Sequence, residues 1–299
     1  MPLHTTMVGA TTSAFPHDVD ARWVMAYGAG LHDLNPCYMD TERHDVVAHP
    51  VFPVCLEWPV ILASRQLRGF ETVTPQERAR GVHAAHDLHI FRQIRAGERL
   101  LTQATVIGLE SIKPGAAQTI RLDTYDAQGE LVCRTFQLGI SRGVAVEGAP
   151  AWLERPPALP TPPASAGSAS PSAGSAPAGR LAIPVAAGLA HTYTECARIW
   201  NPIHTDRKVA LAAGLPDIIL HGTATLALAV TRLVDACLGG DPGRVRRLGG
   251  RFAAMVLMPS TLSLEIQSRQ DGVIFFSLFT EQGHPAISHG FLCFDEGAG

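Results

Sequence analysis

One segment divides this chain almost in the middle and limits what the chain can fold into. Residues 156–180 consist of Pro, Ala, Ser, Gly and Thr with Leu159 as the one large apolar side chain, and end at Arg180. Such a segment cannot offset the entropy of ordering its backbone, so we expect a disordered linker. The chain then consists of an N-terminal repeat, residues 1–155, and a C-terminal repeat, residues 181–299.

The two halves follow one plan. In the C-terminal half, an aromatic lead-in precedes residues 201–204 (Asn-Pro-Ile-His), and the pair His221-Gly222 opens an apolar run that ends at residue 238. In the N-terminal half, residues 33–36 (Asp-Leu-Asn-Pro) align with residues 199–202, Tyr38 aligns with His204, and His49-Pro50 precedes the apolar run 54–67. These matches indicate a diverged duplication.

Several consecutive strand-like segments follow each apolar run. A long helix followed by several strands is typical of an α+β layer in which an antiparallel sheet wraps one helix. The sequence therefore predicts an α+β fold with one such layer in each half.

Composition excludes several classes of protein. The chain is 46% hydrophobic and 17% charged with a net charge of −3, which provides no positive field for nucleic acid. The N-terminus lacks a basic segment followed by an apolar one, and no stretch approaches the ~20 apolar residues that span a bilayer, so we expect a cytoplasmic protein without membrane contact. Six cysteines without a Cys-x-x-Cys pair indicate reduced thiols rather than disulfides or a zinc site.

The starts of the two apolar runs differ in their chemistry. Gly222 offers a backbone N–H at the positive end of a helix, whereas Pro50 at the matching position has none. His204 can transfer a proton near neutral pH, while Tyr38 would need its pKa lowered far from ~10. We therefore expect the site in the C-terminal half.

The motifs of that half resemble the MaoC-like, or hydratase 2, family. The residues that match its pattern are Asn201, Pro202, Ile203, His204, Ala213, Gly214, Pro216, Leu220, His221 and Gly222. The resemblance implies a double hot-dog fold and a hydro-lyase that interconverts an enoyl-CoA and a 3-hydroxyacyl-CoA. It also implies an acyl-CoA or other acyl thioester as substrate, coenzyme A only as part of that substrate, and no bound cofactor or metal. A homodimer is left open.

Each candidate residue has an expected role. We expect His204 to be the acid/base group, Asn201 to orient the attacking water or the thioester, and the N–H of Gly222 to stabilise the negative charge on the thioester oxygen. Expected substrate contacts are Ile199, Trp200, His221 and Asp206.

The same turn departs from the family at two positions. Ile199 stands where the family has its catalytic Asp, and Arg198 stands where it has Gly. Three accounts remain open: Glu195 or Asp206 substitutes for the lost carboxylate, Asp33 of the other half acts across the duplication, or the enzyme needs only His204 and an oxyanion donor. An acyl-CoA thioesterase and a non-catalytic acyl-thioester-binding subunit are the alternative functions.

The sequence contains two further clusters, one of histidines and one of arginines. His83, His86 and His89 lie on one expected strand; by its period of two, His83 and His89 should share a face and His86 should point away, so metal binding is not expected. Arg244, Arg246, Arg247 and Arg251 could meet the phosphates of coenzyme A or form a solvated loop, and the sequence favours neither.

Overall fold

The computed structural model describes the chain apart from residues 1, 43–45, 71–72, 79, 163–179 and 297–299. It divides into two compact units. Unit 1 comprises Met1–Val19, Pro53–Phe91 and Gly97–Pro157, and unit 2 comprises Asp20–Phe52, Arg92–Ala96 and Ala158–Gly299. Most of the expected linker falls on residues 163–179 and so lies outside the described residues.

The units do not coincide with the halves of the sequence. Residues 20–52 precede the linker but belong to unit 2, because α1 (Ala21–Gly30) packs against α5 (Leu189–Ala197). Sequence order alone does not reveal this packing, so the boundary expected at residue 155 does not coincide with the division into compact units.

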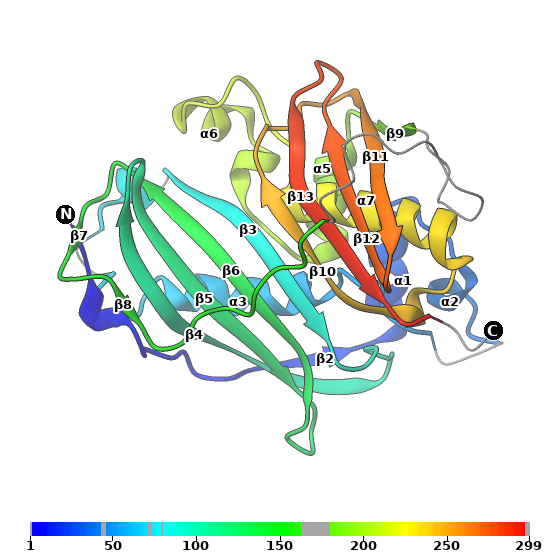
Figure 1. Cartoon of the computed structure of the whole chain (residues 1–299), viewed down its shortest axis with the longest axis horizontal. Coiled ribbons are helices and arrows are strands. Elements are labelled where there is room, and N and C mark those ends of the chain that lie inside the picture. The colour runs from blue at the N-terminus through cyan, green and yellow to red at the C-terminus, as the bar shows by residue number, and fades with distance from the viewer. Residues whose placement is uncertain (1, 43–45, 71–72, 79, 163–179, 297–299) are drawn as a thin grey trace. The chain divides into compact units, whose positions relative to one another are not determined.

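Unit 1 contains a two-stranded parallel sheet of β1 and β7, one long helix and a larger antiparallel sheet. Its strands lie in the order β2-β4-β5-β6-β3, and α3 packs on β4 and β2 (Figure 1). The elements are β1 (Leu3–His4), η1 (Thr5–Met7), β2 (Phe15–Val19), α3 (Pro53–Ser64), α4 (Pro75–Arg78), β3 (Gly81–Ile90), β4 (Glu98–Ile112), β5 (Gly115–Tyr125), β6 (Leu131–Arg142), β7 (Val146–Glu147) and β8 (Ala151–Trp152).

Unit 2 has the same layout. Its antiparallel strands lie in the order β9-β11-β12-β13-β10, and α7 packs on β13 and β9. Besides α1 and α5, the elements are α2 (Pro36–Met39), β9 (Arg180–Val185), η2 (Pro202–His204), α6 (Arg207–Ala212), α7 (Gly222–Leu238), η3 (Pro242–Arg244), β10 (Val245–Phe252), β11 (Ser260–Gln270), β12 (Val273–Phe279) and β13 (Pro285–Phe294).

The matching strand orders agree with the expected duplication. β2, β4, β5, β6 and β3 of unit 1 correspond in order to β9, β11, β12, β13 and β10 of unit 2. The central helix of unit 2 is mostly apolar, with Leu226, Val230 and Leu233 fully buried, and it is followed by Gly239 in the left-handed conformation with φ +66°. Both apolar runs of the sequence therefore form the helices that the pattern predicted.

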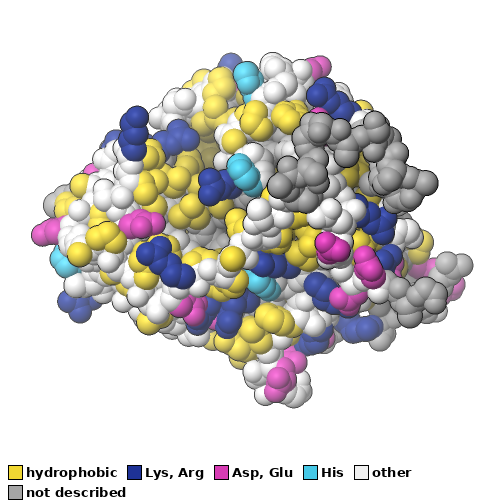
Figure 2. All heavy atoms as spheres, in the orientation of Figure 1, with side chains coloured by type: hydrophobic (Ala, Val, Ile, Leu, Met, Phe, Trp, Pro, Cys, Tyr) yellow, Lys and Arg dark blue, Asp and Glu magenta, His cyan; other side chains and the backbone are white. Residues whose placement is uncertain are grey.

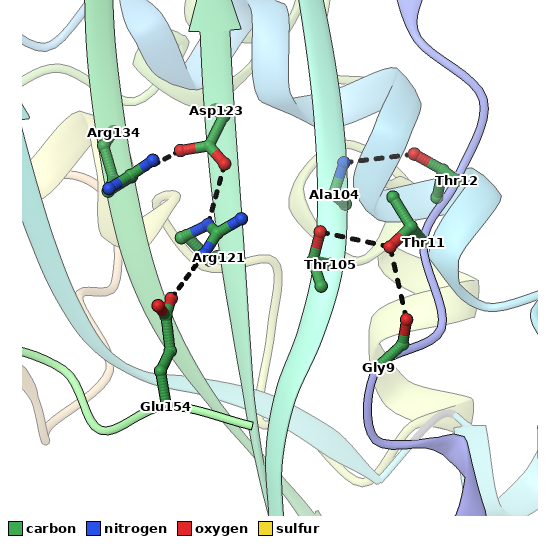
Figure 3. Close-up of polar contacts among 9 residues, drawn as sticks. All are labelled: Gly9, Thr11, Thr12, Ala104, Thr105, Arg121, Asp123, Arg134 and Glu154. Atoms are coloured by element: carbon green, nitrogen blue, oxygen red, sulfur yellow. Dashed lines mark hydrogen bonds and ion pairs between the residues drawn. The ribbon is translucent and has the colours of Figure 1, made fainter. Parts of the chain in front are cut away.

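Hydrogen bonds between charged side chains connect the segment after β8 to the sheet of unit 1. The carboxylate of Asp123 on β5 accepts hydrogen bonds from Arg121 Nε at 2.7 Å and from Arg134 Nε at 2.5 Å. Arg121 also donates to Glu154 Oε1 at 2.6 Å, which ties the segment after β8 to β5 (Figure 3). On the neighbouring strand β4, the N–H of Ala104, which lies opposite Leu122 of β5, donates to Thr12 Oγ1 at 3.1 Å (Figure 3).

A bulge in β3 changes the expected orientation of its histidines. The register shifts between His83, opposite Gly139, and Ala85, opposite Leu138. His83 and His86 therefore share a face, with ring centroids 5.3 Å apart, while His89 lies opposite Arg134 and meets Asp87 at 3.3 Å. The expectation that His83 and His89 share a face was wrong, because strict alternation does not hold through the bulge.

The face shown in Figure 2 carries both positively and negatively charged side chains, and neither kind covers it alone. None of the helices in the described part of the chain combines the length and the hydropathy needed to cross a membrane.

Candidate active site

The candidate turn begins where α5 ends. Arg198 follows the helix in the left-handed conformation, with φ +57°, and its N–H bonds to the carbonyls of Thr194 and Glu195. Glycine adopts this conformation without strain, which gives a physical reason for a Gly at this position. Here the guanidinium of Arg198 stacks on the ring of Trp23, 3.9 Å from its centroid.

The next two side chains point in opposite directions. Ile199 is buried, with 6% of its surface exposed, whereas Trp200 is 58% exposed and its indole N–H donates to Glu195 Oε2 at 3.4 Å. The structure buries only Ile199, so a buried alkyl group lies at the position where the resemblance implies a carboxylate.

Asn201 and Pro202 set the direction of His204. Asn201 is the residue before η2, its carbonyl accepts the N–H of His204 at 3.1 Å, and Pro202 occupies the first helical position. Asn-Pro therefore starts a single tight turn that places His204 at its end.

The ring of His204 has a defined tautomer. Its Nδ1 lies 2.8 Å from the carbonyl oxygen of Ile219, and because a carbonyl can only accept, Nδ1 carries the proton and Nε2 is left as an acceptor. Burial lowers the pKa of His204 to about 4, and the bond to Ile219 partly opposes this shift. The imidazole is therefore neutral at pH 7.

His221 lies directly against His204. The two rings are stacked with centroids 3.7 Å apart, and His221 Nε2 is hydrogen-bonded to Thr194 Oγ1 at 3.2 Å. Burial, and then the neighbouring His204, hold the pKa of His221 well below its usual range. Sequence analysis did not identify Thr194, although it lies in the lead-in to the turn.

Gly222 is the first residue of α7, immediately after His221. The first N–H groups of an α-helix have no partner within the helix and lie at the positive end of its dipole. A Cβ on Gly222 would lie only 3.2 Å from Cδ1 of Phe252, so the close approach of the Phe252 ring favours glycine here.

Neither nearby carboxylate takes the place of the missing Asp. Glu195 is exposed and contacts Trp200, and Asp206 caps α6 by accepting the N–H groups of Lys208 at 2.9 Å and Val209 at 3.2 Å. Within the described residues, no ion pair joins His204 to a carboxylate. Asp206, expected to contact substrate, serves as the N-terminal cap of α6.

The equivalent turn of the N-terminal half is hydrogen-bonded to the middle of α7 and to the segment just after this helix. Asp33 Oδ2 accepts from Thr231 Oγ1 at 2.9 Å, and Asn35 Nδ2 donates to the carbonyl of Gly240 at 2.7 Å. Thr231 follows His221 by ten residues, or roughly 15 Å along a helix, so Asp33 is bonded far from His204. The account in which Asp33 acts at the site therefore has no support in the structure.

His49 extends the hydrogen bonding of this N-terminal turn, because it shares the partner Thr231 with Asp33. His49 Nδ1 accepts the N–H of Val51 at 3.1 Å, so its Nε2 carries the proton and donates to Thr231 Oγ1 at 3.2 Å. Burial lowers the pKa of His49 to about 3 and raises the pKa of Asp33. Tyr38 is buried against His49, and burial raises its pKa well above its usual range, which makes it a poor base.

Two tyrosines that the sequence analysis did not assign connect the two turns. Tyr27 of α1 and Tyr193 of α5 approach with their hydroxyls 3.3 Å apart, and Tyr193 donates to Thr223 Oγ1 at 3.1 Å. Their alignment in the duplicated lead-ins was the available signal. Within the described residues, no cluster of three or more His, Cys, Asp or Glu could hold a metal ion.

Comparisons with known proteins agree with this layout. Residues 169–288 match the MaoC like domain, and residues 6–135 match the FAS1-like dehydratase domain region. The peroxisomal enoyl-CoA hydratase 2 of Arabidopsis thaliana is 33% identical over 89 residues, which cover 30% of this chain and 29% of that protein. Enoyl-CoA hydratase ChsH3 of Mycobacterium tuberculosis is 36% identical over 91 residues, covering 30% of this chain and 32% of that protein. The chain thus spans less than a third of the length of either relative.

Solved structures extend the likeness over the whole chain. The MaoC-like dehydratase of Phytophthora capsici superposes with a TM-score of 0.81 at 17% identity, covering 97% of this chain and 96% of that one. A conserved hypothetical protein of Mycobacterium tuberculosis with a double hotdog fold has a TM-score of 0.59 at 16% identity, covering 96% and 95%. The α+β double hot-dog prediction is confirmed. The chain thus has a double hot-dog fold in which residues 169–288 match the MaoC like domain and residues 6–135 match the FAS1-like dehydratase domain region.

Proposed function

We propose that this protein is a hydro-lyase that interconverts an enoyl-CoA and a 3-hydroxyacyl-CoA, with His204 as its acid/base group. The observation that carries the proposal is the bond from His204 Nδ1 to the carbonyl of Ile219, which leaves Nε2 as a base. The first N–H of α7, at Gly222, lies beside the histidine that stacks on His204. A neutral base and an oxyanion donor are the two groups that addition of water to an α,β-unsaturated thioester requires.

In the hydration direction, His204 Nε2 takes a proton from water while the water oxygen forms a bond to C3 of the enoyl group. The electron pair of the double bond moves toward the thioester oxygen, whose negative charge the Gly222 N–H stabilises. The imidazolium then returns its proton to C2. Because burial lowers the pKa of His204 to about 4, the imidazolium is a strong acid and releases the proton readily.

The buried Ile199 distinguishes this site from one with a catalytic Asp. Without that carboxylate, the attacking water has His204 and Asn201 as its hydrogen-bonding partners on the turn. We propose that the native acyl group places an apolar part against Ile199. The N-terminal turn acts as an anchor for α7, since Asp33 bonds to Thr231 within the helix and Asn35 bonds to Gly240 just after its end.

The test is an assay of purified protein with enoyl-CoA and 3-hydroxyacyl-CoA thioesters. A change in the absorbance of the conjugated enoyl thioester supports a hydratase if the wild-type protein causes it and His204→Ala does not. Release of free thiol without change at C2 and C3 would instead indicate a thioesterase. Binding of acyl-CoA without either reaction would indicate a non-catalytic subunit.

A further inference from the structure

Three hydroxyl groups of unit 2 form a chain of hydrogen bonds that ends at the first turn of α7. The Tyr193 hydroxyl donates to Thr223 Oγ1 at 3.1 Å, and the hydroxyls of Tyr27 and Tyr193 lie 3.3 Å apart. Because Tyr193 gives its one proton to Thr223, it accepts from Tyr27 at the other contact. The chain therefore runs from Tyr27 of α1 through Tyr193 of α5 to Thr223 of α7.

The proton of the Thr223 hydroxyl is not used within the described part of the protein. Thr223 Oγ1 accepts from Tyr193, and no described residue accepts its own proton. Thr225, two residues farther along α7, differs, because its hydroxyl donates to the carbonyl of His221 at 3.0 Å, the usual partner of a threonine in a helix. Thr225 is buried, whereas Thr223 is only half-buried. Thr223 thus presents an unused O–H donor at the accessible start of the helix.

The backbone donors beside this hydroxyl are unused as well. His221 precedes α7 but makes no side-chain cap hydrogen bond, and its Nε2 is bonded to Thr194 Oγ1 instead. Among the described residues, the N–H groups of Gly222 and Thr223 have no hydrogen-bond partner. The Cα–Cβ bond of a helical residue tilts toward the N-terminus of the helix, so the Thr223 side chain and these N–H groups are directed toward the same end of α7.

The N-terminal half lacks all three donors at the aligned positions. Residues 49–51 (His-Pro-Val) align with residues 221–223 (His-Gly-Thr). Pro50 has no N–H, and the N–H of Val51 is bonded to His49 Nδ1 at 3.1 Å. Valine also has the shape of threonine without its hydroxyl. The donors are therefore present together in one half and absent together in the other, which favours a shared role for them.

A chain of hydroxyls strengthens the donor at its end. Each hydroxyl that accepts a hydrogen bond becomes a better donor, because polarisation passes along the chain in a low-dielectric interior. Tyr27 and Tyr193 are both fully buried. The proton of Thr223 therefore suits an acceptor that gains negative charge, as a thioester oxygen does when water adds to the adjoining double bond.

We propose that the Thr223 hydroxyl donates a second hydrogen bond to the thioester oxygen, beside the N–H of Gly222, and that Tyr193 and Tyr27 are positioning residues that orient it. This inference rests on the proposed function. A second donor at the oxygen lowers the barrier in a site where Ile199 offers the attacking water no acceptor.

The test compares three variants of the full chain. Thr223→Val removes the hydroxyl and keeps the shape of the side chain, and Thr223→Ser is the matched control that keeps the hydroxyl. Removing one oxyanion donor costs ~10²–10³ in kcat, so we expect Thr223→Val to lower kcat on crotonyl-CoA by ~10² with little change in KM. Thr223→Ser should stay close to the wild type. Tyr193→Phe leaves the Thr223 hydroxyl in place but unoriented and should lower kcat less than Thr223→Val.

A second readout requires no turnover. Acetoacetyl-CoA ionises to an enolate with its own ultraviolet absorbance, and donors at the thioester oxygen raise the fraction of bound ligand in this form. We expect the wild-type protein and Thr223→Ser to raise the enolate absorbance at a fixed pH. Thr223→Val should lower the ratio of bound enolate to bound ketone about tenfold, as loss of one hydrogen bond to a charged oxygen predicts.

The outcomes separate this inference from the proposed function. Enolate stabilisation that is lost in Thr223→Val, in a protein that hydrates no enoyl-CoA, would support the second donor and contradict the hydratase. Hydration by the wild type, with kcat and enolate ratio unchanged in Thr223→Val, would overturn the second donor alone. Equal losses in Thr223→Ser and Thr223→Val would also overturn it, because the hydroxyl would not be responsible. If denaturation curves show that Thr223→Val does not fold, Thr223→Ala removes the hydroxyl instead and the same criteria apply.

Discussion

The imidazoles of His204 and His221 are stacked with their centroids 3.7 Å apart and their planes 26° apart. His221 precedes the first residue of α7, and Thr194, to which its Nε2 is hydrogen-bonded, belongs to α5. One histidine thus connects the proposed base to the helix that carries the proposed oxyanion donor. This arrangement keeps both groups in fixed relation without a carboxylate between them.

His204→Ala should lower kcat by ~10²–10⁴ with a small effect on substrate binding, because it removes a positioned base. Tyr38→Phe is the matched control in the other half. The Tyr38 hydroxyl is buried without a hydrogen-bond partner among the described residues, so its loss should leave activity near that of the wild type. Steady-state kinetics on an enoyl-CoA measure both. A larger loss of activity from Tyr38→Phe than from His204→Ala would indicate that the catalytic site lies in the N-terminal half.

Ile199→Asp should reduce both stability and turnover of the native substrate. Ile199 is 6% exposed, and an unpaired polar group there costs about 1–3 kcal/mol, or more when charged. Ile199→Asn is the control, because the side chain of asparagine has a similar shape to that of aspartate but cannot ionise. Denaturation curves and kinetics on crotonyl-CoA are the measurements. A substantial gain in crotonyl-CoA hydration, with native-substrate activity unchanged, would contradict this expectation and favour a hydratase weakened only by loss of the Asp.

Gly222→Ala should lower kcat about tenfold or more while the protein stays folded. The new Cβ would lie 3.2 Å from Cδ1 of Phe252, so either the ring or the start of α7 must move, and small misplacements at a reacting centre are costly. Gly188→Ala is the control, because nothing lies within 4 Å of a Cβ at Gly188 before α5. Similar kinetics for both variants would speak against a role for the Gly222 backbone.

Thr231→Val should destabilise the protein by about 1–3 kcal/mol, because it removes the partner of both Asp33 and His49. Thr231→Ser keeps the hydroxyl and should lose much less. Urea denaturation monitored by fluorescence compares the two. Equal stability of the Val variant and the wild type would show that this hydrogen-bond chain does not anchor α7.

The free energy of unfolding should fall as the pH drops below about 6.5. Burial lowers the pKa of His49 to about 3, so between pH 6.5 and 3 the unfolded chain binds a proton at this site that the folded chain does not. Each such histidine lowers stability by up to about 1.4 kcal/mol per pH unit in that range. Denaturation at a series of pH values should show a shallower dependence in His49→Gln than in the wild type. An unchanged slope would contradict a neutral buried His49.

Several features could be predicted from local sequence because local chemistry determines them. The Asn-Pro pair starts η2, the apolar runs form α3 and α7, and the lack of an N–H at Pro50 distinguishes the two helix starts regardless of packing. The repeated order of a helix and consecutive strands was sufficient to predict the double α+β layout.

Other features depend on contacts between residues distant in sequence. Ile199 and Trp200 are adjacent and both apolar, yet only the packing of the turn decides that Ile199 is buried and Trp200 exposed. The bulge that brings His83 and His86 together arises from the register of β3 with β6, which alternation along one strand cannot reveal. Residues 20–52 belong to unit 2 because α1 packs on α5, a partner more than 150 residues away, as the 173-residue separation of the Trp23–Cys196 hydrogen bond illustrates. Sequence by itself determined the repeats, the turn and the residue types of the site, since these follow from backbone and side-chain chemistry; tertiary structure decided burial, tautomer and pairing, since these depend on which surfaces exclude water.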